Sequence, residues 1–92
     1  MILLPKDDIA KQPILSQIAK KFSRGKIYEE SEVNRIITSF DTEDHVLFRR
    51  ELINFGYLQR DPYKGTYWLL KTELSQETLD AIGKRQKKTQ KD

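Results

Sequence analysis

The feature that most constrains this fold is a five-residue stretch, Gly56-Tyr57-Leu58-Gln59-Arg60. It follows a run with helical periodicity over residues 44–55 and leads into a strand–turn–strand pattern over residues 59–70. Glycine at this position can adopt the left-handed conformation that ends a helix without a Cβ clash. A helix, a glycine stop and a hairpin in this order predict the last helix and the wing of a winged helix-turn-helix domain.

Apolar residues at helical spacing predict two helices before this stretch. The first is expected to begin at Pro13, because a proline costs no hydrogen bond in the first turn of a helix. The second follows the carboxylate-rich segment Glu29–Glu32, where the helix dipole stabilises negative charge. Asp41-Thr42 is expected to break the chain and to cap a third helix over residues 43–55.

The predicted fold class is α+β, a small winged helix-turn-helix domain. It has three helices, a two- or three-stranded antiparallel wing sheet and an extra C-terminal helix. A chain of 92 residues is long enough for one such domain with a single core. We expect residues 1–83 to form it, with an N-terminal arm over residues 1–12 and the C-terminal helix starting over residues 75–83. Residues 84–92 are predicted to be a basic, frayed tail.

Composition argues against several classes of function. The chain has no cysteine and one histidine, His45, so we expect no metal site and no cofactor. The serines have no second histidine to activate them, and no glycine-rich phosphate-binding motif is present, so we do not expect an enzyme. No apolar run approaches the length of a membrane span. We therefore expect a cytoplasmic protein without a membrane partner.

The positive charge is concentrated at one end. The formal net charge is +3, but Lys84, Arg85, Lys87, Lys88 and Lys91 all lie in the last nine residues. Residues 1–83 hold 12 Lys and Arg against 13 Asp and Glu, a net charge of −1. A nearly neutral domain is not the footprint of a strong, autonomous DNA-binding protein.

Four motifs resemble a bacterial family known as domain of unknown function 2087. They are Tyr28-Glu29-Glu30-Ser31-Glu32-Val33-Asn34, Asp44-His45-Val46-Leu47-Phe48-Arg49-Arg50-Glu51-Leu52, Gly56-Tyr57-Leu58-Gln59-Arg60 and Tyr67-Trp68. The chain departs from the family pattern at Phe48, where Leu is usual, and at Leu69, where Arg is usual. The resemblance implies a winged-helix-like fold and a role connected with transcription, without an established activity.

The leading hypothesis is a domain that binds double-stranded DNA in bacterial transcription regulation. Arg49 and Arg50 on the third helix are the sharpest candidates, because Arg can fork onto guanine or clamp a phosphate. Each has an alternative, an ion pair with carboxylates of the second helix, and the sequence does not separate the two. Thr42 before the third helix and Tyr63 and Lys64 in the wing are expected to contact the DNA backbone.

The rival hypothesis is a protein-interaction or dimerisation module that does not touch DNA. Val46, Leu47 and Ile53 place apolar side chains outside the main buried stripe of the third helix, where a groove-reading helix usually carries polar ones. Val46 can instead contact a thymine methyl group. A protein partner or a second copy of the chain would equally explain these residues.

Overall fold

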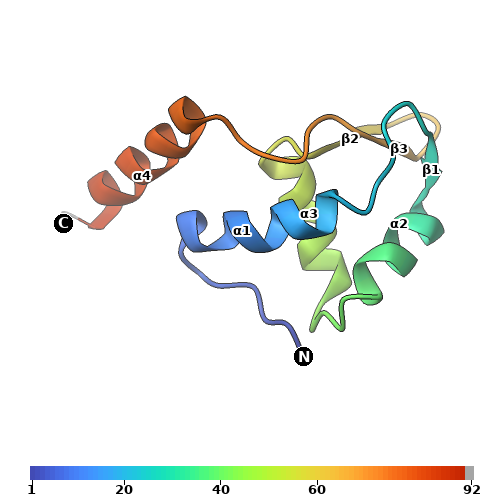
Figure 1. The fold of residues 1–92 in the computed structure, drawn as a ribbon, viewed down its shortest axis with the longest axis horizontal. Coiled ribbons are helices and arrows are strands. Elements are labelled where there is room, and N and C mark those ends of the chain that lie inside the picture. Colours follow the sequence, from blue (N-terminus) through green and yellow to red (C-terminus); the bar gives the residue numbers. More distant parts are fainter. Residues whose placement is uncertain (91–92) are drawn as a thin grey trace.

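The computed structural model describes residues 1–90, with side chains described as far as Arg85, and its fold is α+β (Figure 1). Within these residues it has four helices and one three-stranded antiparallel sheet. The elements in chain order are α1 (Asp8–Ala19), β1 (Tyr28–Glu29), α2 (Glu30–Thr38), α3 (His45–Asn54), β2 (Leu58–Asp61), β3 (Thr66–Leu69) and α4 (Gln76–Gln90). This order is compatible with a small winged-helix-like fold.

The sheet has the order β1-β3-β2, so the first strand joins the hairpin formed by the last two. In the hairpin, Gln59 lies opposite Trp68 and Arg60 opposite Tyr67. On the other edge of β3, Tyr28 of β1 pairs with Tyr67. The predicted hairpin is confirmed, and the sheet has three strands.

One core joins α1, α2 and α3 to the sheet. Its fully buried side chains include Leu15 of α1, Val33 and Ile37 of α2, and Phe48 and Leu52 of α3, each with no exposed surface. Tyr57 is also fully buried, and its hydroxyl donates to Oε1 of Gln12 at 2.8 Å. That bond satisfies the polar end of an otherwise apolar side chain.

Gly56 ends α3 as the sequence predicts. Its φ is +81°, in the left-handed region. The N–H of Tyr57 donates to the carbonyl of Leu52 at 2.9 Å, and the N–H of Gly56 donates to that of Ile53 at 3.0 Å. These two bonds form a Schellman motif, which satisfies the last carbonyls of the helix and turns the chain directly into β2.

The predicted start of the first helix is wrong. Asp8 begins α1, five residues before Pro13, and the Asp7 side chain caps it by accepting from the N–H of Ala10 at 3.2 Å. Pro13 therefore lies inside the helix and not in its first turn. The helix tolerates this because its N-cap and its buried face, which includes Leu15, offset the hydrogen bond that proline cannot make.

The predicted cap of the third helix is also displaced. Asp44, not Asp41 or Thr42, is the N-cap of α3, and its carboxylate accepts from the N–H groups of Val46 and Leu47 at 3.1 and 3.2 Å. Asp41 has a φ of 55°, which turns the chain sharply before the helix. Residues 41–43 then pair with the N-terminal arm, where Ile2 and Thr42 form a parallel bridge.

α4 extends beyond the predicted limit at Gly83 and continues to Gln90. A glycine inside a helix costs only about 1 kcal/mol relative to alanine, and the Lys, Arg and Gln residues that follow favour helix. Figure 1 shows α4 at one end of the molecule, joined to the sheet by a long connection. Residues 91–92, the end of the tail that the sequence predicts to fray, lie outside the described residues.

Candidate functional site

The side chains of α3 point in four directions, and three of them lead into the protein. Phe48 and Leu52 enter the core and are fully buried. By helical-wheel arithmetic, Arg49 and Glu51 lie about 100° or less to either side of this buried pair. Each of these charged residues contacts a different neighbouring helix, so α3 is fixed both in position and in rotation.

Arg49 faces α2. Its guanidinium donates a short hydrogen bond to Oδ1 of Asn34 and lies 3.9 Å from Oε1 of Glu30. Only 15% of its side chain is exposed. The same Glu30 oxygen accepts from the Tyr67 hydroxyl at 2.9 Å, and burial together with this bond raises the pKa of Tyr67. The structure therefore gives Arg49 the ion pair with α2 that the sequence left as an alternative, and extends it to β3.

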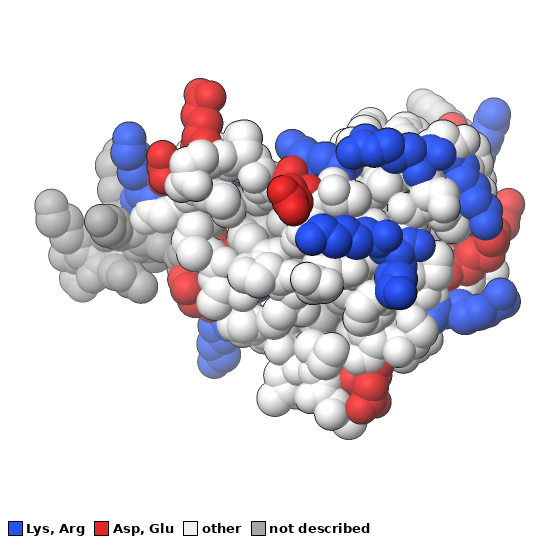
Figure 2. Space-filling view, in the orientation of Figure 1, with Lys and Arg blue, Asp and Glu red and all other residues white. Residues whose placement is uncertain are grey.

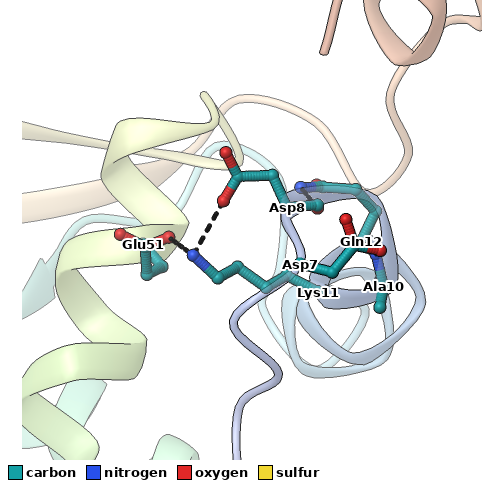
Figure 3. Close-up of polar contacts among 6 residues, drawn as sticks. All are labelled: Asp7, Asp8, Ala10, Lys11, Gln12 and Glu51. Carbon is teal, nitrogen blue, oxygen red and sulfur yellow. Dashed lines mark hydrogen bonds and ion pairs between the residues drawn. The ribbon is translucent and has the colours of Figure 1, made fainter. Parts of the chain in front are cut away.

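Glu51 faces α1. Lys11 donates to Glu51 at 3.1 Å and to Asp8 at 2.8 Å, bridging the two carboxylates between the helices (Figure 3). Burial lowers the pKa of Lys11, but its hydrogen bonds to these carboxylates outweigh that effect and the net direction is upward. Because the side chains of Lys11 and Glu51 are each only 15% exposed, this pair is better protected from water than a surface salt bridge.

The fourth direction of α3 is open. Val46, Leu47, Arg50 and Asn54 project within a sector of about 100°, and we call these four residues the outer stripe. Val46 is 40% exposed and Leu47 38%, and Arg50 and Asn54 are also exposed. No described residue forms a hydrogen bond or an ion pair with the side chain of Arg50 or Asn54. Neighbouring arginines therefore differ: Arg49 is held by α2 and Arg50 faces solvent.

Ile53, the third residue of the predicted partner interface, projects within about 20° of Val46 but lies two turns further along α3. It is half-buried against the core. It also lines a shallow hollow between the end of α3 and β2, with Leu58, Arg60 and Leu70 among the other lining residues. Only two of the three apolar residues therefore belong to the outer stripe.

Tyr63 and Lys64 lie at the tip of the β2–β3 hairpin. Tyr63 is 96% exposed, and Lys64 is exposed beside it. The Asp61 carboxylate shapes the turn by accepting from the N–H groups of Tyr63 and Lys64 at 2.9 and 3.2 Å. These backbone bonds, that of Lys64 first, lower the pKa of Asp61. Figure 1 shows this tip beside β1, away from the N-terminal end of α3.

Thr42 is not at the start of α3. It lies three residues before His45, half-buried, and its hydroxyl donates to the carbonyl of Ile37 at 3.4 Å. The arm residue Ile2 donates to the carbonyl of Asp41 and accepts from the N–H of Glu43, which covers this segment. The five predicted DNA contacts are therefore spread over the arm-covered connection, the α2–α3 contact, the outer stripe and the hairpin tip.

Sequence reasoning missed two exposed residues near these positions. Asn54 follows Arg50 by four residues and completes the outer stripe. Arg60 is exposed on β2, with its guanidinium 5.9 Å from the centre of the Tyr67 ring. The signal for Asn54 was available in the sequence, because residues four apart share a helix face. Strand alternation places Arg60 on the same face as Leu58, which is buried, so the pattern did not indicate that Arg60 is exposed.

A group of exposed Lys and Arg residues lies where α1 ends and the chain leads to β1. Figure 2 shows Lys and Arg side chains gathered over this part of the molecule. Lys20, Lys21, Arg24 and Lys26 are all exposed. Two of them have a carboxylate nearby, Lys20 with Glu73 at 3.5 Å and Lys26 with Glu32 at 3.9 Å. Exposed pairs of this kind are weak and leave the segment positive.

Comparison with known families now adds to this geometry. The bacterial family described as "Uncharacterized protein conserved in bacteria (DUF2087)" matches residues 1–69. The chain belongs to the DUF2087 family. The resemblance over residues 28–68 is thereby confirmed, and the match includes every element from α1 to β3 but ends before α4. The comparisons with curated proteins and with solved structures give no match.

Two further properties of this DUF2087 member bear on the kind of site it can hold. None of the helices within residues 1–90 combines the length and apolarity needed to cross a bilayer. In the part of the chain that the structure describes, no three His, Cys, Asp or Glu side chains are grouped to hold a metal ion.

Proposed function

We propose that this protein binds double-stranded DNA as a small winged-helix domain in bacterial transcription regulation, a binding role and not a catalytic one. The observation that carries the proposal is the composition of the outer stripe. An arginine and an asparagine four residues apart, both without an internal partner, follow two exposed apolar residues on a helix that is fixed on its other sides.

Each residue type of the outer stripe has a base-reading chemistry. Arginine donates two bonds to O6 and N7 of guanine, and asparagine pairs with N6 and N7 of adenine. Val46 and Leu47 offer methyl groups that suit the thymine C5-methyl. Arg50 and Asn54 are four residues apart, about 6 Å along the helix axis, so they would reach neighbouring positions in the major groove.

The internal contacts of α3 support this role. Groove reading needs a helix whose rotation is fixed, because a small turn about its axis moves every side chain off the base edges. The pairs Arg49–Glu30 and Lys11–Glu51 fix that rotation from two sides. Arg49 therefore acts by positioning α3, and Arg50 is the proposed base contact.

The hairpin supplies the proposed backbone contacts. Lys64 and Tyr63 at the tip would approach phosphates next to the groove, as the wing of a winged helix does, and Arg60 on β2 adds a further exposed cation. The carboxylate next to them, Asp61, is already bonded to two backbone N–H groups. Thr42 is not among the proposed contacts, because the arm covers its segment.

The carboxylates before α3 weigh against tight binding but do not exclude it. The Asp44 carboxylate caps the helix, whereas Glu43 is exposed and does not cap it. The charge of −1 over residues 1–83 predicts modest affinity that falls with salt. Two domains acting together, or a fused partner, would raise it.

A selection experiment tests the proposal. The full chain is used to enrich duplexes from a random-sequence pool at low salt, and the enriched sequence serves as the probe. Arg50→Ala and Asn54→Ala should each weaken binding to this probe by about 1 to 3 kcal/mol, which is roughly 5- to 150-fold. The matched control is Arg35→Ala, which removes the same charge from an exposed position on α2. Equal losses in Arg50→Ala and Arg35→Ala would reduce the binding to bulk charge and contradict base reading.

The exposure of Val46 and Leu47 favours a second candidate, a protein partner that covers the outer stripe. The selection separates the two. If no duplex is enriched, and binding to random DNA disappears when salt is raised, the groove proposal fails and the partner proposal remains. The double variant Val46→Ser, Leu47→Ser should then abolish partner binding while the fold is retained.

A further inference from the structure

α4 is an addition to the domain that the family match defines. The match ends at residue 69, and α4 begins at Gln76. Its one fully packed apolar side chain, Ile82, is 2% exposed but does not belong to the main core cluster. α4 therefore packs on α1 through a contact of its own, outside the main core cluster.

A hollow runs beside α4 where it crosses the start of α1. It is lined by Ile9, Gln76, Leu79, Asp80, Gly83 and Lys84. Ile9 is 36% exposed, and a Cβ placed on Gly83 would meet only Ile9 Cδ1, at 4.0 Å. The glycine therefore lies where α4 passes the side chain of Ile9 on α1. A second hollow shares Ile9 and Leu79 with the first and is also lined by the exposed Pro13 of α1.

The charges along α4 are separated by sign. Glu77 and Asp80 lie in its first half, and the basic run begins at Lys84. Asp80 accepts a hydrogen bond from Gln76, but no described residue forms an ion pair with Asp80 or Lys84. A helix that is acidic in its first half and basic in its second is complementary to an antiparallel copy of itself.

We propose that a second copy of this chain occupies the hollow, with its α4 antiparallel to the first across a two-fold axis near Ile82. In this arrangement Asp80 of each copy lies opposite Lys84 of the other. Leu79 and Ile9 of both copies then supply the apolar contact. The contact is isologous, so the pair is closed and does not grow into a filament.

The proposal is independent of DNA binding, because it concerns a different face and needs no nucleic acid. If both hold, two outer stripes related by a two-fold axis would read two half-sites, and their spacing would be set by the α4 pair. Failure of one proposal leaves the other standing, because the oligomeric state is measured without DNA.

Sedimentation equilibrium of the full chain over a wide concentration range is the test. The wild type should form a dimer. Asp80→Lys and Lys84→Asp should each weaken self-association by on the order of tenfold or more, because each creates two like-charged pairs across the axis. The matched control, Arg35→Glu on the exposed face of α2, should leave the dimer unchanged.

Mixing the two variants decides whether the charges act between copies. Asp80→Lys and Lys84→Asp chains together pair opposite charges at both contacts, so the mixture should recover a heterodimer of wild-type strength. Repulsion within one helix, between positions four apart, would not be relieved by mixing. A monomeric wild type, charge reversals that associate as tightly as the wild type, or a mixture that stays monomeric would each overturn the proposal.

Discussion

The inner faces of α3 and its outer stripe place similar side chains in different surroundings. Arg49 and Arg50 are adjacent and carry the same charge, yet Arg49 is bonded to Asn34 and lies next to Glu30, while Arg50 faces solvent. The charged residues of the inner faces, Glu51 and Arg49, form ion pairs that hold the helix against α1 and α2. The polar groups of the outer stripe, on Arg50 and Asn54, remain exposed to solvent. Charge alone therefore does not identify a contact residue; the direction of the side chain does.

The largest expected change in the free energy of unfolding comes from comparing a core residue of α3 with its neighbour in the outer stripe. Phe48 is fully buried, and Phe48→Ala should lower the free energy of unfolding by about 3 to 5 kcal/mol because it leaves a cavity in the core. Leu47, 38% exposed in the outer stripe, is the control, and Leu47→Ala should cost under about 1 kcal/mol. Urea unfolding measures both. Similar losses at the two positions would mean that the outer stripe is covered by protein.

The pH dependence of stability at alkaline pH tests the burial of Tyr57. Burial, with a smaller contribution from Glu73, raises the pKa of Tyr57 to about 12. In the unfolded chain the pKa of tyrosine is about 10. The neutral Tyr57 side chain therefore contributes about 3 kcal/mol to the free energy of unfolding below pH 10, and this contribution is lost as the pH rises towards 12.

The measurement is the free energy of unfolding at several alkaline pH values. Tyr57→Phe should flatten the decline, whereas Tyr63→Phe, at a side chain that is 96% exposed, should leave it as it is. The same decline in the wild type and Tyr57→Phe would assign the pH dependence to other groups.

The smallest effect compares the two arginines directly. Arg49→Ala should lower the free energy of unfolding by about 1 to 2 kcal/mol, because Asn34 and Glu30 lose a charged partner. Arg50→Ala should change it by less than about 0.5 kcal/mol. Thermal and urea unfolding of the two variants side by side give the answer. An equal loss in both would show that Arg50 also has a structural partner.

Local signals in the sequence were enough for the elements but not for their ends. The periodic apolar stripes predict α2 and α3, and Gly56 predicts where α3 stops, because both depend on residues within one or two turns. The start of α1 was missed because Pro13 offers a plausible first turn while the true cap, Asp7, lies in a segment without clear periodicity. The cap of α3 was misplaced for a similar reason, since Asp41, Thr42 and Asp44 are all good capping residues.

The candidate site depended on contacts that are distant in the sequence. Whether Arg49 or Arg50 is available follows from the rotation of α3 against α2, and that rotation is set by the packing of Phe48 and Leu52. Thr42 is covered by Ile2, which is far from it along the chain. Periodicity identifies which residues share a face, but only the packed structure shows which face is left open.

The position of Trp68 has a practical consequence. It is the only tryptophan in the sequence, and it lies half-buried on β3 opposite Gln59, in the hairpin that carries Tyr63 and Lys64. Its fluorescence therefore comes from a single known place. Loss of the sheet would shift the emission of this indole, and a ligand settling on the hairpin would quench or enhance it, so unlabelled protein can report on both events.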